Sequence, residues 1–272
     1  VIINIIYRWL MKRNILTLII AVFALTQAAA QTYDNLWKQA DIIARKDQPR
    51  SEIGVMKKII SKASAAKDYG QLMAAEMRQM ILWKEISADS LTPNVERMEA
   101  EVLKVKDPAL KAVRYAVLGK VYSDMDEKKS EEFFKKALQQ PELLAKHTST
   151  EYVPLTLKGV DGSSFNNDLL HLIGFEADSK EAYHLMYTYY NKVGNRGAAC
   201  LCAYKLIEKY RQDDVREVKK SKYLHTIDSL IHVYQDIPEA GELAVEHFRF
   251  MEGATDAKPL DKLNYINYAL SH

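Results

Sequence analysis

Apolar side chains recur every three or four residues along most of the chain from Tyr33 onward, which is the spacing of one face of an α-helix. These amphipathic segments come in pairs that begin near Tyr33, Tyr69, Pro108, Lys180 and Lys222. The first three starts lie about 36 to 39 residues apart, close to the periods of known helical repeats. The pattern therefore predicts an all-α fold of about five antiparallel helix pairs.

The clearest repeat signature lies between Pro108 and Pro141. It reads Leu-Gly-x-x-Tyr, then an aromatic residue, Ala and Pro over about 34 residues, the order found in tetratricopeptide helix pairs. Gly119 lies inside the first helix of this pair, where it costs roughly 1 kcal/mol relative to Ala, so we expect the second helix to approach it closely. A tetratricopeptide-like α-solenoid is predicted, since one pair cannot bury its own apolar face. An ordinary helical bundle is the alternative.

An irregular insertion interrupts the repeat at residues 142–179. Tyr152–Leu157 is expected to be extended, and Gly159–Gly162 is expected to form a turn. Asn167 or Ser164 is expected to cap a short helix that starts near Asp168. The sequence leaves open whether this insertion is a packing wedge or a contact surface.

Residues 11–30 have the order of a secretory signal peptide. A basic start is followed by the uncharged apolar run Ile15–Leu25, and Ala28-Ala29-Ala30 offers a cleavage site before Gln31. Residues 1–10 are interpreted as upstream sequence from an over-long gene prediction. The apolar run is shorter than the about 20 residues that a membrane span needs, although a retained anchor is the alternative.

The mature part, residues 31–272, is therefore expected to be exported to the periplasm or cell envelope, with no stable membrane span after cleavage. A net charge of +2, from 38 basic and 36 acidic side chains, argues against nucleic acid as a partner. The share of hydrophobic residues, 48%, is enough for a sizeable core. The two cysteines, Cys200 and Cys202, point to different faces of a helix, so they are expected to be buried and not bonded to each other.

Catalytic and metal-binding patterns are missing from the sequence. No phosphate-binding loop, zinc-protease pair or nucleophile elbow is present, and the seven His are dispersed. His225 and His232 share a helix without a third ligand at a recognisable spacing. The methionines Met73, Met77 and Met80 continue an apolar stripe and are expected to fill the core. We therefore expect no metal or cofactor.

The carboxylate pairs Asp213-Asp214 and Glu131-Glu132 lie in lysine-rich stretches typical of a solvated helix face. An enzyme is expected only if Asn167, Asp168 and His171 in the insertion form a site. No catalytic residue is assigned, and the chain is expected to be no enzyme.

Three strings carry a resemblance to a known family: Tyr33–Lys38, Phe165–His171 and Gly194–Cys202. They resemble the N-terminal helical region of the large alpha-2-macroglobulin-like proteins of Bacteroidetes, and the resemblance covers Tyr33–His272. In that family the helical region precedes macroglobulin β-sandwich domains, a bait region and often a thioester domain, and the proteins are thought to trap or inhibit attacking proteases. This chain has no Cys-Gly-Glu-Gln thioester string, so no inhibitory residue is carried over.

The helical pattern continues to His272 without a C-terminal cap signal, so the chain is interpreted as a fragment that is truncated at its C-terminus. The resemblance implies a non-catalytic scaffold or interaction module at the N-terminus of such a protein. The alternative is a free-standing secreted adaptor that binds an envelope protein or peptide. In both cases the expected partner is a protein, and the 16 tyrosines suit a binding surface of that kind.

Overall fold

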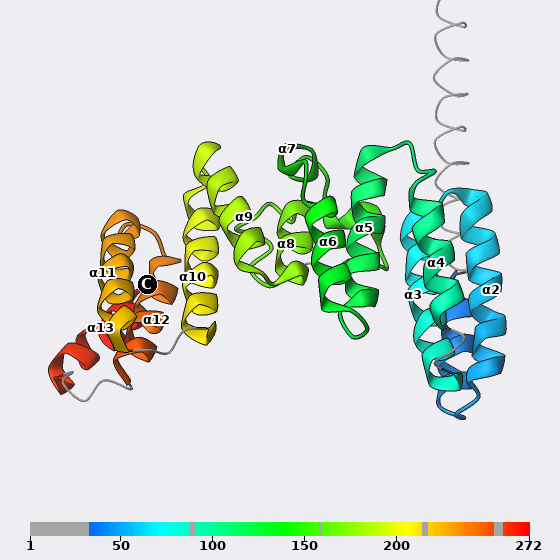
Figure 1. The fold of residues 1–272 in the computed structure, drawn as a ribbon, viewed down its shortest axis with the longest axis horizontal. Helices are drawn as coiled ribbons and strands as arrows, with labels where there is room; N and C mark the ends of the chain where they lie inside the picture. Colours follow the sequence, from blue (N-terminus) through cyan, green and yellow to red (C-terminus); the bar gives the residue numbers. More distant parts are fainter. Residues whose placement is uncertain (1–32, 88–90, 158, 214–216, 253–257) are drawn as a thin grey trace, which may run out of the picture. The chain divides into compact units, whose positions relative to one another are not determined.

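The computed structural model describes residues 33–87, 91–157, 159–213, 217–252 and 258–272 (Figure 1). The predicted signal peptide and the residues before it lie outside this part of the chain. Throughout the described residues the fold is all-α, and the only β-type pairing among them is an isolated bridge between Thr148 and Asp168. No described helix is long and apolar enough to cross a membrane. The chain divides into two compact units between Asn94 and Val95.

The first unit is built around three helices, over residues 33–44, α2 (Pro49–Ala66) and α3 (Tyr69–Ile86). Proline opens α2 and the Asp68 carboxylate caps α3 by accepting a hydrogen bond from the Gln71 N–H at 3.2 Å. The helices share one apolar core, whose most buried members are Ala40, Met56, Ile59, Ala63 and Ala75. Of the methionine stripe, Met73 and Met80 are buried, as core filling requires, whereas Met77 is half-buried.

The second unit holds most of the remaining helices. They are α4 (Leu91–Val102, which starts before the boundary), α5 (Pro108–Tyr122), α6 (Glu127–Ala137), α7 (Pro141–Leu144), α8 (Leu169–Ala177), α9 (Lys180–Lys192), α10 (Arg196–Asp213), α11 (Glu217–Tyr234), α12 (Ala240–Glu252) and α13 (Pro259–Ser271). Consecutive helices pack together in the pairs α5 with α6, α9 with α10, α11 with α12, and α12 with α13. Aspartate or serine caps the starts of α5, α6, α8 and α9, so polar residues in the short turns fix where these helices begin.

The expected close contact at Gly119 is present. A Cβ atom on Gly119 would lie 2.7 Å from Cδ2 of Phe134 on α6, closer than side chains approach one another. The Ser130 hydroxyl on α6 also donates a hydrogen bond to the Gly119 carbonyl oxygen at 2.8 Å. The missing side chain therefore lets α6 lie directly against α5, which offsets the cost of glycine in a helix.

Helix starts at Tyr69, Pro108 and Lys180 agree with the sequence prediction. The last predicted start was wrong, because α11 begins at Glu217 instead of Lys222. The added turn is Glu-Val-Lys-Lys-Ser, which has almost no apolar periodicity but is rich in residues that favour helices.

The insertion differs from its prediction in two places. Tyr152–Leu157 is not extended. A 3₁₀ turn, η2 (Ser149–Tyr152), ends at its first residue, and the Thr156 N–H donates to the Tyr152 carbonyl at 3.2 Å. The reason is a capping box in which the Glu151 carboxylate accepts the Thr148 N–H at 2.8 Å, a local bond that competes with extended structure.

The second difference is the cap of α8, which is Asp168 instead of Asn167 or Ser164. The turn at Gly159–Gly162 is confirmed, since the Gly162 N–H donates to the Gly159 carbonyl at 3.1 Å. Helix α8 packs against α5, α6 and α9, so this part of the insertion is a packing element.

Candidate functional site

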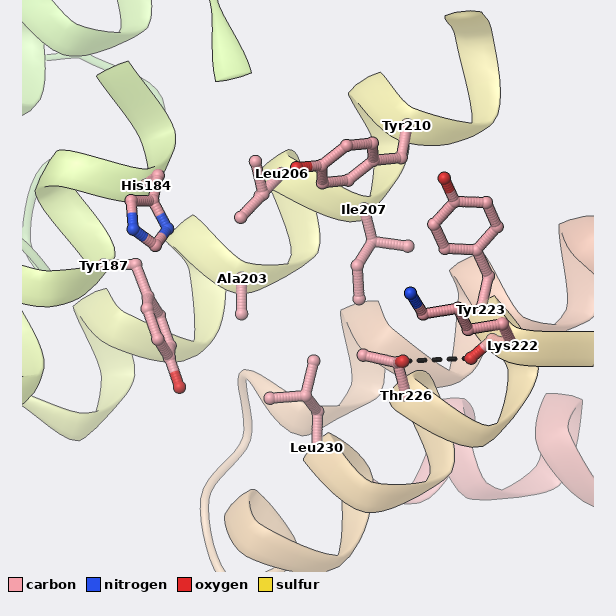
Figure 2. A pocket seen from close by; sticks show the side chains of 10 residues that line it. All are labelled: His184, Tyr187, Ala203, Leu206, Ile207, Tyr210, Lys222, Tyr223, Thr226 and Leu230. Atoms are coloured by element: carbon pink, nitrogen blue, oxygen red, sulfur yellow. Dashed lines mark hydrogen bonds between the residues drawn. The ribbon is translucent and has the colours of Figure 1, made fainter. Parts of the chain in front are cut away.

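A groove crosses three successive helices, α9, α10 and α11, within the second unit (Figure 2). Its volume is about 420 Å³. Ten described residues line it: His184, Tyr187, Ala203, Leu206, Ile207, Tyr210, Lys222, Tyr223, Thr226 and Leu230. We call this feature the α9–α11 groove.

Helical spacing places these residues on one face of each helix. On α10 the positions Ala203, Leu206, Ile207 and Tyr210 fall within two turns at intervals of three and four residues. The floor is apolar, since Ala203 and Ile207 are 3% and 4% exposed. Nearer the start of α10, the small residues Ala198 and Ala199 are fully enclosed.

Aromatic rings form one wall of the groove. The Tyr210 and Tyr223 rings are stacked with their centroids 5.7 Å apart, and Tyr223 in turn lies 5.6 Å from the Phe250 ring of α12. The Lys180 ammonium sits 4.7 Å above the centre of the Tyr210 ring. Tyr210 stays 37% exposed, so this wall presents aromatic surface to solvent.

Polar groups are few and placed along α11. The Thr226 hydroxyl donates to the Lys222 carbonyl at 2.9 Å, which leaves its oxygen lone pairs available. Figure 2 shows the Lys222 side chain directed into the groove toward Ile207. It is the only residue with a permanent charge among the ten.

A second set of aromatic and polar residues, drawn from the insertion and from α9, is enclosed within the protein. This insertion cluster comprises Phe165, Asp168, His171, Phe175 and Tyr190. The Tyr190 hydroxyl donates to both Asp168 carboxylate oxygens at 2.9 and 3.0 Å, and the His171 backbone N–H donates to the same carboxylate at 2.8 Å. The His171 ring stacks on Phe165 with centroids 4.1 Å apart and planes 3° from parallel.

Burial shifts both titratable groups of the insertion cluster. It raises the pKa of Asp168 to about 6, against the hydrogen bonds from His171 and Tyr190 that favour the carboxylate. It lowers the pKa of His171 to about 4, with the Val160 backbone opposing the shift. Neither ring nitrogen of His171 forms a well-aligned hydrogen bond with a described residue.

The insertion cluster is not arranged for acid–base chemistry. Asp168 and His171 are 3% and 0% exposed, and the carboxylate contacts the backbone of His171, not its imidazole. Asn167 lies beside the cap, and its carbonyl accepts the Ser149 N–H at 2.9 Å. A general base must come within hydrogen-bonding reach of its substrate, which this enclosure prevents.

The other candidate residues are apart from one another. His225 and His232 are exposed on α11, Glu131 and Glu132 are exposed on α6, and no described group of His, Cys, Asp and Glu could hold a metal ion. Asp213 ends α10, and Asp214 lies outside the described residues. Cys200 and Cys202 are both buried and unbonded, as predicted, and burial raises the pKa of each thiol.

Three tyrosines of α9, Tyr183, Tyr187 and Tyr190, recur at helical spacing but differ in exposure. Tyr183 and Tyr190 are each 2% exposed, whereas Tyr187 is half-buried and lines the groove. Tyr210 and Tyr223 were missed. The sequence signal for Tyr210 and Tyr223 is a separation of seven residues, about two helical turns, from Ala203 and Leu230, which places each tyrosine on the same helix face as an apolar residue.

Comparisons with known protein families, with curated proteins and with solved structures find no match to this chain. The resemblance to alpha-2-macroglobulin-like proteins therefore stays a prediction.

Proposed function

We propose that the mature chain is a non-catalytic, tetratricopeptide-like module that binds another polypeptide through the α9–α11 groove. The observation that carries this proposal is the groove itself: an apolar floor and a stacked tyrosine wall, open to solvent, across three successive helices. Tyrosine side chains that reach the surface are among the residues most enriched in protein interfaces. The close packing of α6 on α5 at Gly119 supports the repeat interpretation, since tetratricopeptide pairs need such a contact.

The enclosed state of Asp168 and His171 supports a role without chemistry. A stack of helix pairs offers room for a protein interface of ordinary size, roughly 1,600 Å² in total. The near-neutral net charge of +2 implies that apolar and aromatic contacts supply most of the affinity.

Capture from an envelope extract tests this proposal. We expect the wild-type chain to retain an envelope protein, or the remainder of its own parent protein, through a wash at high salt. Leu230→Asp should abolish capture, because it places a charge on the apolar side of the groove. The matched control is Val233→Asp on the same helix, where the side chain is 57% exposed and does not line the groove. Equal capture by both variants would contradict the proposal.

The proposed parent is a secreted or periplasmic alpha-2-macroglobulin-like protein, and this part of the proposal rests on the sequence resemblance alone. A free-standing secreted adaptor is the second candidate. The nucleotide sequence after the codon for His272 separates them: an open frame that continues into β-rich macroglobulin repeats supports the parent protein, and a stop codon supports the adaptor.

A further inference from the structure

The charge and spacing of the residues along α11 narrow the class of ligand that the α9–α11 groove can take. Of its ten lining residues none is acidic, and Lys222 is the only permanent cation. The Lys222 ammonium points into the groove (Figure 2). This end of the groove is complementary to a negative charge.

The opposite end is apolar. Leu230 lies eight residues after Lys222 on α11, with Thr226 midway between them. At 1.5 Å per residue these three side chains are spaced about 6 Å apart along the helix. In an extended peptide, side chains on one face repeat every second residue, about 6.7 Å apart. The two periods nearly match, so successive same-face residues of an extended peptide meet Lys222, Thr226 and Leu230 in turn.

The groove also limits how a peptide backbone can be held. Backbone hydrogen-bonding groups within helices are used inside each helix, so the groove offers no strand edge for β-sheet addition. Side chains must therefore supply any hydrogen bonds to the peptide backbone, and the polar side-chain groups of the groove include the Thr226 oxygen and the tyrosine hydroxyls. A volume of about 420 Å³ is within the range of small-ligand sites and suits a few residues of chain instead of a folded domain.

We propose that the α9–α11 groove binds an extended peptide segment with an acidic residue, a small polar residue and an apolar residue at alternate positions. The acidic side chain pairs with Lys222, the polar side chain meets Thr226, and the apolar side chain packs against Leu230. This inference rests on the proposed function and specifies the chemistry of the partner.

A charge-swap experiment on the full chain tests the inference. The probes are fluorescent pentapeptides with blocked termini, Glu-Ala-Ser-Ala-Phe and its reversed order, and the same two peptides with Lys in place of Glu. We expect the better of the two acidic probes to bind wild type about fivefold or more tighter than its lysine counterpart, as for an exposed ion pair and its reversal. Lys222→Glu should invert this preference, and high salt should reduce it.

The control is Lys57→Glu, which reverses an exposed lysine of the first unit and should leave the preference unchanged. Inversion by Lys222→Glu alone supports the inference. Equal binding of acidic and lysine probes would overturn it while leaving the groove as a binding surface. Failure of every probe to bind would overturn the inference and count against the proposed function as well.

Discussion

The insertion cluster and the α9–α11 groove use the same kinds of residue in opposite ways. Both combine tyrosines, a histidine and apolar side chains, and both draw a tyrosine from α9, Tyr190 in one and Tyr187 in the other. Tyr190 is 2% exposed, and its hydroxyl donates to both carboxylate oxygens of the buried Asp168. Tyr187 is half-buried at the edge of an open groove. Residue type alone therefore does not decide between core and contact surface.

The difference lies in where the polar atoms find partners. A buried carboxylate without a partner costs free energy, and Asp168 avoids this cost by accepting hydrogen bonds from the His171 backbone and the Tyr190 hydroxyl, which join α8 to α9. Polar atoms in the groove are satisfied by water at little cost and can exchange it for a ligand. The closed cluster should therefore govern stability, and the open groove should govern binding.

Truncation of one ring in each region should show the largest effect. Phe165 is fully buried between His171, Phe175 and Tyr190, so Phe165→Ala should lower the free energy of unfolding of the second unit by about 3 to 5 kcal/mol. Tyr210→Ala removes a ring that is 37% exposed and should cost about 1 kcal/mol or less. Urea denaturation of both variants measures the two losses. Similar losses would contradict the division between a closed and an open region.

Titration of Asp168 and His171 should change the stability by less than Phe165→Ala does, and in wild type their two effects should largely cancel. Because the Asp168 pKa rises from 3.8 to about 6 on folding, its contribution to stability is present below 3.8 and is lost as pH rises through 6. Because the His171 pKa falls from 6.5 to about 4, its contribution is present above 6.5 and is lost as pH falls through 4. The two trends oppose each other between pH 4 and 6 and nearly cancel.

Replacing either Asp168 or His171 should therefore expose the pH dependence of stability that the other residue causes. In Asp168→Asn only His171 titrates, so the free energy of unfolding should rise by about 2 to 3 kcal/mol as the pH is raised from 4 to 6.5. In His171→Leu only Asp168 titrates, so the free energy of unfolding should fall by a similar amount as the pH is raised from 4 to 6. Each slope is about 1.4 kcal/mol per pH unit between the unfolded and folded pKa values of the remaining group. Urea denaturation across this range, with wild type as the reference, measures both slopes. If both variants follow the wild-type profile, these groups are not buried as described.

Much of the fold was predictable because periodicity and capping are local. The starts at Tyr69, Pro108 and Lys180 follow from an N-cap residue or proline beside an apolar stripe. Gly119 signalled a close helix contact before any partner residue was known. The first turn of α11 was missed because its residues favour a helix by propensity and give no periodic signal.

The insertion and the groove were harder to predict, for different reasons. The 3₁₀ turn at η2 depends on the side-chain bonds of Thr148 and Glu151, which a polar stretch does not reveal by its pattern. The groove depends on three helices meeting, so Tyr210 and Tyr223 look like ordinary stripe positions until α10 and α11 are placed together. Tertiary packing decides which aromatic residues stay open.

Site-specific photo-crosslinking tests most directly whether the α9–α11 groove is the surface that binds a partner. A benzophenone amino acid is placed at Leu230, which lines the groove, or at Val233, which is 57% exposed on the same helix but lies outside it. After irradiation in envelope extract, the account predicts a discrete cross-linked product from position 230 and little or none from position 233. Equal products from the two positions, or a product from position 233 alone, would contradict it.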